Sequence, residues 1–150
     1  MAVHERCHNK STMNKITTEK LLSNDPLLRE LVADLRLQSD LVALWVYGSR
    51  ATGSAQANSD YDLAAAFSNH DEPAYNRRMK PELVAIDLYA KYQIPISLVD
   101  ISLCPLPLAI NIIEEGVVLT VLDEQRYLAE LSRTDALWEN QKLQQRASQQ

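Results

Sequence analysis

The residues best suited to chemistry lie in one stretch, where a glycine–serine pair precedes two closely spaced aspartates. Gly48 and Ser49 follow one apolar run, and Asp60 and Asp62 stand at the start of the next. Because side chains alternate along a strand, the two aspartates are expected on the same side of a sheet. Two carboxylates this close repel each other unless a cation lies between them, so the pair is either a metal site or an electrostatic liability. Carboxylate oxygens suit Mg²⁺, which also takes substrate phosphates as ligands.

Gly48 and Ser49 offer the complementary half of such a site. A glycine lets the backbone approach a ligand closely, and the amide groups of a following helical turn favour an anion such as a triphosphate. The Ser49 hydroxyl adds a hydrogen bond and Arg50 adds a positive charge. Since the chain contains neither a P-loop motif nor the GxGxxG fingerprint, the stretch predicts a nucleoside triphosphate site of another type.

Each half also has a simpler interpretation, because an isolated Asp-x-Asp is most often a solvated strand end and an isolated Gly-Ser is a turn. Here both occur together between apolar runs. In this arrangement the sequence resembles the minimal nucleotidyltransferases of the DNA polymerase β superfamily, whose signature is Gly-Ser, ten intervening residues and Asp-x-Asp. That signature is matched without a gap by Gly48, Ser49, Asp60 and Asp62.

The resemblance implies a third carboxylate on a neighbouring strand. Asp100 stands at the end of an apolar run, where that residue would fall. It is favoured over Asp87, which lies in an expected helix. Residues 112–119 also look like the family's helix, glycine and short strand. The resemblance therefore covers about residues 27–123 and implies a polymerase β-like nucleotidyltransferase fold.

The same resemblance implies a reaction, the transfer of a nucleoside monophosphate from an NTP to a hydroxyl with release of pyrophosphate. Asp60 and Asp62 would hold a Mg²⁺ ion on the triphosphate, and with Asp100 they would hold a second ion at the acceptor oxygen. Asp100 would also serve as a general base. The nucleotide, expected to be ATP, would be bound through its phosphates by Gly48, Ser49 and Arg50.

The length of the chain bears on the acceptor. Polymerases and RNA-tailing members carry extra domains that grip nucleic acid, and 150 residues leave no room for them. Stand-alone members look like the antitoxin half of toxin–antitoxin pairs, in which the transferase adenylylates a tyrosine of a HEPN-domain ribonuclease. The leading hypothesis is thus a Mg²⁺-dependent protein adenylyltransferase that neutralises a HEPN toxin. A small-molecule nucleotidyltransferase of the aminoglycoside-modifying kind and an antitoxin that acts by binding alone remain alternatives.

Apolar periodicity and turn residues predict the elements that position these groups. Helices are expected at residues 26–37, 81–91, 108–115 and 123–146. Strands are expected at 41–47, 61–67, 94–101 and 117–122, the last as a final strand or an edge extension. Pro81 suits the first turn of its helix and Gly116 the end of another.

The segment at 48–59 is expected to be a turn, with or without a short helix, followed by a loop. The segment at 68–80 is expected to be a loop or a frayed helix entry. Together the elements predict one α/β (α+β) domain at 24–146, in which helices pack on a small mixed sheet. A flexible polar leader at 1–23 and a frayed tail at 147–150 are expected to flank it.

Composition excludes several classes of protein. The chain has 15 basic and 20 acidic residues, and a net charge of -5 argues against broad binding to a phosphate backbone. Its longest apolar run, at 41–47, is far shorter than the ~20 residues of a membrane span. The polar N-terminus lacks the apolar segment of a signal peptide. We therefore expect a cytoplasmic protein without direct contact with nucleic acid or membrane.

The remaining polar residues are expected to be structural. Two cysteines without a CxxC pairing are interpreted as free thiols: Cys7 and Cys104. Three histidines without metal-ligand spacing are interpreted as surface residues: His4, His8 and His70. A basic cluster is expected in a solvated loop, or alternatively near a nucleotide phosphate or an acidic partner: Arg77, Arg78 and Lys80. Tyr61 should face away from the aspartates and pack in the core.

Overall fold

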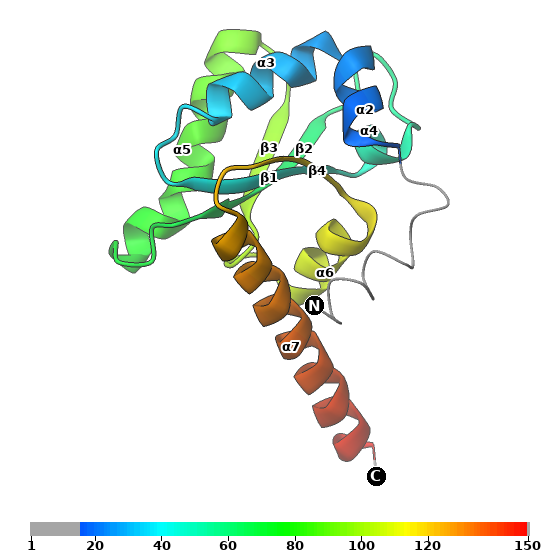
Figure 1. The fold of residues 1–150 in the computed structure, drawn as a ribbon, viewed down its shortest axis with the longest axis vertical. Helices are drawn as coiled ribbons and strands as arrows, with labels where there is room; N and C mark the ends of the chain where they lie inside the picture. The colour runs from blue at the N-terminus through cyan, green and yellow to red at the C-terminus, as the bar shows by residue number, and fades with distance from the viewer. Residues whose placement is uncertain (1–15, 150) are drawn as a thin grey trace.

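The computed structural model describes residues 16–149 and shows a mixed four-stranded sheet with helices on both faces (Figure 1). The strands, in the sheet order β3-β2-β1-β4, are β3 (Ile96–Asp100), β2 (Tyr61–Phe67), β1 (Leu41–Tyr47) and β4 (Val117–Val121). β1 pairs antiparallel with β2 and with β4, whereas β2 and β3 are parallel. The helices are α2 (Thr18–Asn24), α3 (Pro26–Leu35), α4 (Ser49–Thr52), α5 (Ala74–Tyr92), α6 (Leu106–Glu115) and α7 (Glu124–Ser148). The expected small mixed sheet with packed helices is confirmed.

Side-chain alternation along the central strands divides the core into two layers. On β2, Leu63 and Ala65 face the cluster formed with α3 and α5, while Ala64 and Ala66 face the cluster formed with α6 and α7. Figure 1 shows α3 and α5 on one side of the sheet and α6 and α7 on the other. Since β1 and β2 are covered on both faces, they are apolar at nearly every position, as a central strand must be.

The N-terminal segment is more ordered than expected, because part of the leader predicted at 1–23 forms α2. Thr17 caps this helix by accepting a hydrogen bond from the Lys20 amide at 3.2 Å. Leu21 is buried in the core, and the Thr18 hydroxyl donates to the Val118 carbonyl at 2.6 Å. Packing against β4 therefore stabilises a helix whose short sequence gives little periodic signal. The rest of the leader, with Cys7, His4 and His8, lies outside the described residues.

α5 begins seven residues earlier than expected, so the prediction of a loop or frayed entry at 68–80 is wrong for residues 74–80. Pro73 precedes the helix, and Pro81 lies inside it rather than in its first turn. A proline in a helix removes one backbone hydrogen bond. The helix continues because Pro81 is buried and the turns after it pack on the core through Val84 and Leu88.

The C-terminal elements largely follow expectation. β4 is an edge strand of the sheet, and Asp123 caps α7 by accepting from the Arg126 amide at 3.1 Å. α6 ends before Gly116, but this glycine has an extended backbone, and it is needed because a Cβ would lie 2.4 Å from the Ile112 carbonyl oxygen. α7 extends to Ser148, past the expected end at residue 146, and projects from the body of the molecule (Figure 1).

Within residues 16–149, no helix is long and apolar enough to cross a bilayer.

Candidate active site

The turn after β1 requires glycine for two reasons. Gly48 has a φ of 71° and a ψ of -151°, a conformation that L residues rarely adopt. A Cβ at this position would also lie 2.6 Å from the Asp62 Oδ2 atom. The one-turn helix α4 follows, and Gly53 closes it with a φ of 78°. Gly48 therefore redirects the chain and leaves the space in which the Asp62 carboxylate lies.

Asp60 and Asp62 form the interacting pair that the sequence predicts. Asp62 is the second residue of β2 and pairs across the sheet with Tyr47, the last residue of β1. Burial raises the pKa of the Asp62 carboxyl, and the nearby charge of Asp60 raises it further. Both effects disfavour ionisation, so a bound divalent cation would relieve the repulsion.

A row of polar side chains extends from Asp62 to both neighbouring strands. Tyr47 lies beside it on β1, and Ser97 lies beside it on β3 in the parallel register. Burial raises the pKa of the Tyr47 phenol, the Asp62 charge adds to this effect, and a hydrogen bond with Ser97 opposes it. Sequence analysis missed Tyr47 and Ser97. The available signal was a tyrosine directly before Gly48 and a lone serine inside an apolar strand.

Asp100 is not brought to the carboxylate pair. It pairs with Ala65, three residues along β2 from Asp62, which corresponds to about 10 Å at the usual rise of a strand. Alternation places it on the opposite face from Ser97. In the part of the chain that the structure describes, no three Asp, Glu, His or Cys side chains are grouped so that they could hold a metal ion. The prediction of Asp100 as a third ligand is therefore not supported.

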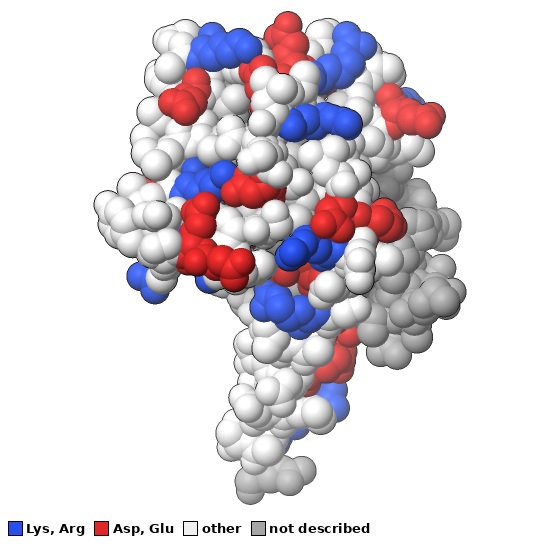
Figure 2. All heavy atoms as spheres, turned by 60° about the vertical axis from the view of Figure 1, so that its left-hand side comes forward, with Lys and Arg blue, Asp and Glu red and all other residues white. Residues whose placement is uncertain are grey.

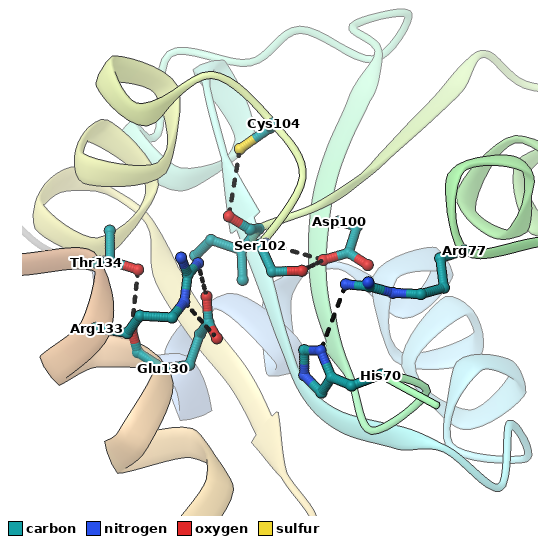
Figure 3. Close-up of polar contacts among 9 residues, drawn as sticks. His70, Arg77, Asp100, Ser102, Cys104, Glu130, Arg133 and Thr134 are labelled. Atoms are coloured by element: carbon teal, nitrogen blue, oxygen red, sulfur yellow. Dashed lines mark hydrogen bonds and ion pairs between the residues drawn. The ribbon is translucent and has the colours of Figure 1, made fainter. Parts of the chain in front are cut away.

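Asp100 instead shapes the turn after β3 (Figure 3). It is 4% exposed, and its Oδ1 atom accepts hydrogen bonds from the Ser102 amide at 2.8 Å and the Ser102 hydroxyl at 2.7 Å. Burial raises the pKa of its carboxyl, and the Ser102 hydrogen bonds partly oppose this. Asp87, the competing candidate, is exposed on α5.

Arg50 is occupied by contacts other than those expected of a phosphate ligand. Its Nη2 atom donates to the Ser59 carbonyl at 2.8 Å, and its guanidinium lies 4.0 Å from the centre of the Tyr61 ring. Tyr61 is buried and donates to the Asp25 carboxylate at 2.9 Å, and burial followed by this hydrogen bond raises its pKa to about 12. Tyr61 faces away from the aspartates, as predicted. Arg50 thus holds the loop that leads into Asp60.

The predicted basic cluster lies on α5 rather than in a loop. The Lys80 Nζ atom lies 2.6 Å from an oxygen of Asp40, the residue before β1. The carboxylate pair lies beside the other end of β1, where Asp62 pairs with Tyr47. Arg77 lies 3.4 Å from the ring of His70, which is exposed as expected, and faces Asp100 in Figure 3. These contacts do not favour the alternative of a nucleotide phosphate for Arg77 or Lys80.

A groove of about 430 Å³ opens beside the carboxylate pair. One wall comes from α5, the other from the start of β3, and Asp60 lies at its edge. Its lining residues are Asp60, Ala85, Ile86, Tyr89, Pro95, Ile96 and Ser97. The polar groups of this lining are Asp60, Ser97 and the Tyr89 hydroxyl, and the rest of the lining is apolar. The groove therefore connects Asp60 to an apolar surface.

The mixed sheet, the glycine turn and the paired carboxylates define a nucleotide-handling domain. The sequence model of the family Polymerase beta, Nucleotidyltransferase matches residues 29–125, and the chain belongs to this family. The match includes the Gly48 turn, Asp60 and Asp62. No curated protein matches the chain by sequence.

Solved structures share the fold at low sequence identity. A chain of a toxin–antitoxin crystal structure with AMP-PNP is 18% identical, with a TM-score of 0.65 over 79% of this chain and 92% of that chain. A chain of the toxin–antitoxin MntA-HepT structure is 17% identical, with a TM-score of 0.60 over 79% and 90%. A chain from the complex of a tri-AMPylated Shewanella oneidensis HEPN toxin with an MNT antitoxin is 16% identical, with a TM-score of 0.59 over 85% and 93%.

Proposed function

We propose that this chain is a Mg²⁺-dependent adenylyltransferase that transfers AMP from ATP to a tyrosine hydroxyl of a HEPN-domain toxin in the cytoplasm, and so acts as its antitoxin. The observation that carries the proposal is the Asp60–Asp62 pair beside the Gly48 turn in a nucleotidyltransferase family member. The similar solved structures support the choice of nucleotide and partner, because they include an AMP-PNP complex and an AMPylated HEPN toxin.

Asp60 and Asp62 are assigned to metal binding in this proposal. These two carboxylates would hold a magnesium ion, which would supply positive charge to the phosphates of the bound nucleotide. The Gly48 turn and the Ser49 hydroxyl are assigned to the β and γ phosphates. The acceptor oxygen attacks the α-phosphorus, the bond to pyrophosphate breaks, and the acceptor proton passes to solvent. Arg50 contributes indirectly, by holding the loop before Asp60.

Neutralisation by binding alone is the second candidate, and one observation favours it. The position beside Asp62 on β3 holds Ser97 rather than a carboxylate. A site with two carboxylates offers fewer ligands for a second metal ion than a site with three. A chain of this kind could retain the partner surface while its transfer chemistry is weak.

Incubation with labelled ATP, Mg²⁺ and a HEPN-domain toxin distinguishes the two candidates. Transfer predicts label on the toxin with the wild type and at least about a hundredfold less with Asp62→Asn. Asp71→Asn, on an exposed loop at the far end of β2, is the matched control and should label normally. Toxin that is neutralised without any label would reject transfer and support binding alone.

A further inference from the structure

α5 has a second apolar face that the domain does not cover. Val84 and Leu88 pack against the sheet. On the outer side, four large side chains are exposed, and we call them the α5 stripe: Tyr75 (72%), Leu83 (54%), Ile86 (62%) and Tyr89 (52%). A surface helix normally has one apolar face, directed at the core. A second such face marks an interaction surface.

The α5 stripe is continuous with the candidate active site. Ile86 and Tyr89 belong both to the stripe and to the wall of the groove whose edge is Asp60. A molecule that covers the stripe and fills this groove therefore also contacts Asp60. This continuity fits the acceptor, which must bring a hydroxyl to that edge.

The rim of the α5 stripe is acidic at the end that lines the groove, whereas the exposed Arg78 lies nearer Tyr75 at the other end. Glu82 and Asp87 are exposed on the same helix, and no lysine or arginine occurs between Pro81 and Ala90. Among the ion pairs of the described residues, none includes Glu82 or Asp87. Figure 2, turned so that the left-hand side of Figure 1 comes forward, shows both acidic and basic groups on this side of the molecule, several of them adjacent to one another. The unpaired rim charges are thus available to a basic partner.

We propose that the α5 stripe docks the protein that carries the acceptor hydroxyl, through an apolar surface of that protein bordered by lysine or arginine. This inference rests on the proposed function for the existence of a protein acceptor. A second copy of the chain fits the stripe less well, because a two-fold contact is self-complementary and tends to bring the acidic rims together. It would also cover the mouth of the groove beside Asp60.

Calorimetric titration of the chain with a HEPN-domain toxin, without ATP, tests the docking surface separately from transfer. The Ile86→Ala, Tyr89→Ala double variant is expected to weaken binding at least about tenfold, because buried aromatic and aliphatic anchors dominate interfaces. Leu137→Ala with Leu143→Ala removes comparably exposed side chains from α7 and is the matched control, expected within about twofold of the wild type. Glu82→Lys with Asp87→Lys is expected to weaken binding most at low salt.

Three outcomes would overturn the proposal. The first is an unchanged affinity for the toxin in the Ile86 and Tyr89 double variant when its thermal unfolding matches the wild type. The second is an equal loss of affinity in the α7 control. The third is a wild type that sediments as a dimer while the double variant sediments as a monomer. The last would assign the stripe to a second copy. A wild type that binds the toxin but transfers no AMP would reject the proposed function alone, and the affinities would still decide the docking surface.

Discussion

Substitution of the two positive-φ glycines by alanine tests the geometry of the candidate site, because the two positions differ in backbone region and in whether a Cβ would meet a site residue. Both have backbone conformations that alanine disfavours. The Cβ of Ala at Gly48 would lie 2.6 Å from a carboxylate oxygen of Asp62, whereas at Gly53 it would meet the flexible end of Ile16 at 3.0 Å. Only Gly48→Ala should therefore displace a site residue.

The expected magnitudes follow from these conformations. Gly53 is in the left-handed helical region, where alanine costs about 1 kcal/mol. Gly48 is in a region open almost only to glycine, so Gly48→Ala should cost about 3 kcal/mol. For a domain of this size these losses correspond to about 3 °C and about 9 °C in Tm. A carboxylate displaced by a fraction of an ångström to about 1 Å should lower AMP transfer by about ten- to a hundredfold.

Thermal unfolding and AMP transfer to a HEPN toxin, measured on both variants below their Tm, check this prediction. Gly53→Ala should remain within a few-fold of wild-type transfer. Equal losses of stability and of transfer in the two variants would refute the argument, because they would show that the approach of Asp62 to Gly48 imposes no constraint.

Three further predictions concern single side chains. In EDTA at pH 7, Asp62→Asn should raise Tm. The fold raises the pKa of the Asp62 carboxyl, so its ionisation lowers stability as the pH rises above the ordinary carboxyl pKa. The gain in Tm should therefore vanish in acid, where the carboxyl is protonated. A lower Tm in EDTA would contradict it. Asp100→Asn should keep most AMP transfer, because the amide oxygen of Asn still accepts from Ser102. Asp100→Ala should lower the free energy of unfolding in denaturant by about 1–3 kcal/mol. Loss of AMP transfer in an Asp100→Asn variant of full stability would show that Asp100 belongs to the site. Arg50→Ala should lose about 2 kcal/mol of stability through its contacts with Ser59 and Tyr61, and unchanged stability with abolished ATP binding would instead indicate a phosphate ligand.

Local sequence signals predicted most of the fold for identifiable reasons. The strands at 41–47 and 61–67 were found because both of their faces are apolar. Asp25 and Asp123 cap α3 and α7 by accepting from the Leu28 and Arg126 amides, which is a contact within a few residues of the chain. The misjudged elements depend on packing. α2 forms because Leu21 and Thr18 contact the rest of the domain. α5 continues through Pro81 because that residue and the Val84 and Leu88 side chains after it are buried.

The sequence by itself determined the Gly48 turn and the Asp60–Asp62 pair, because a glycine conformation and a two-residue alternation are local properties of the chain. Only the tertiary structure decided which other side chains lie beside them. The register of β2 with β3 places Ser97 rather than Asp100 beside Asp62, and the Tyr61 ring draws Arg50 to the other side of the strand. Register and long-range contacts depend on residues far apart in the sequence, so no local pattern carries them.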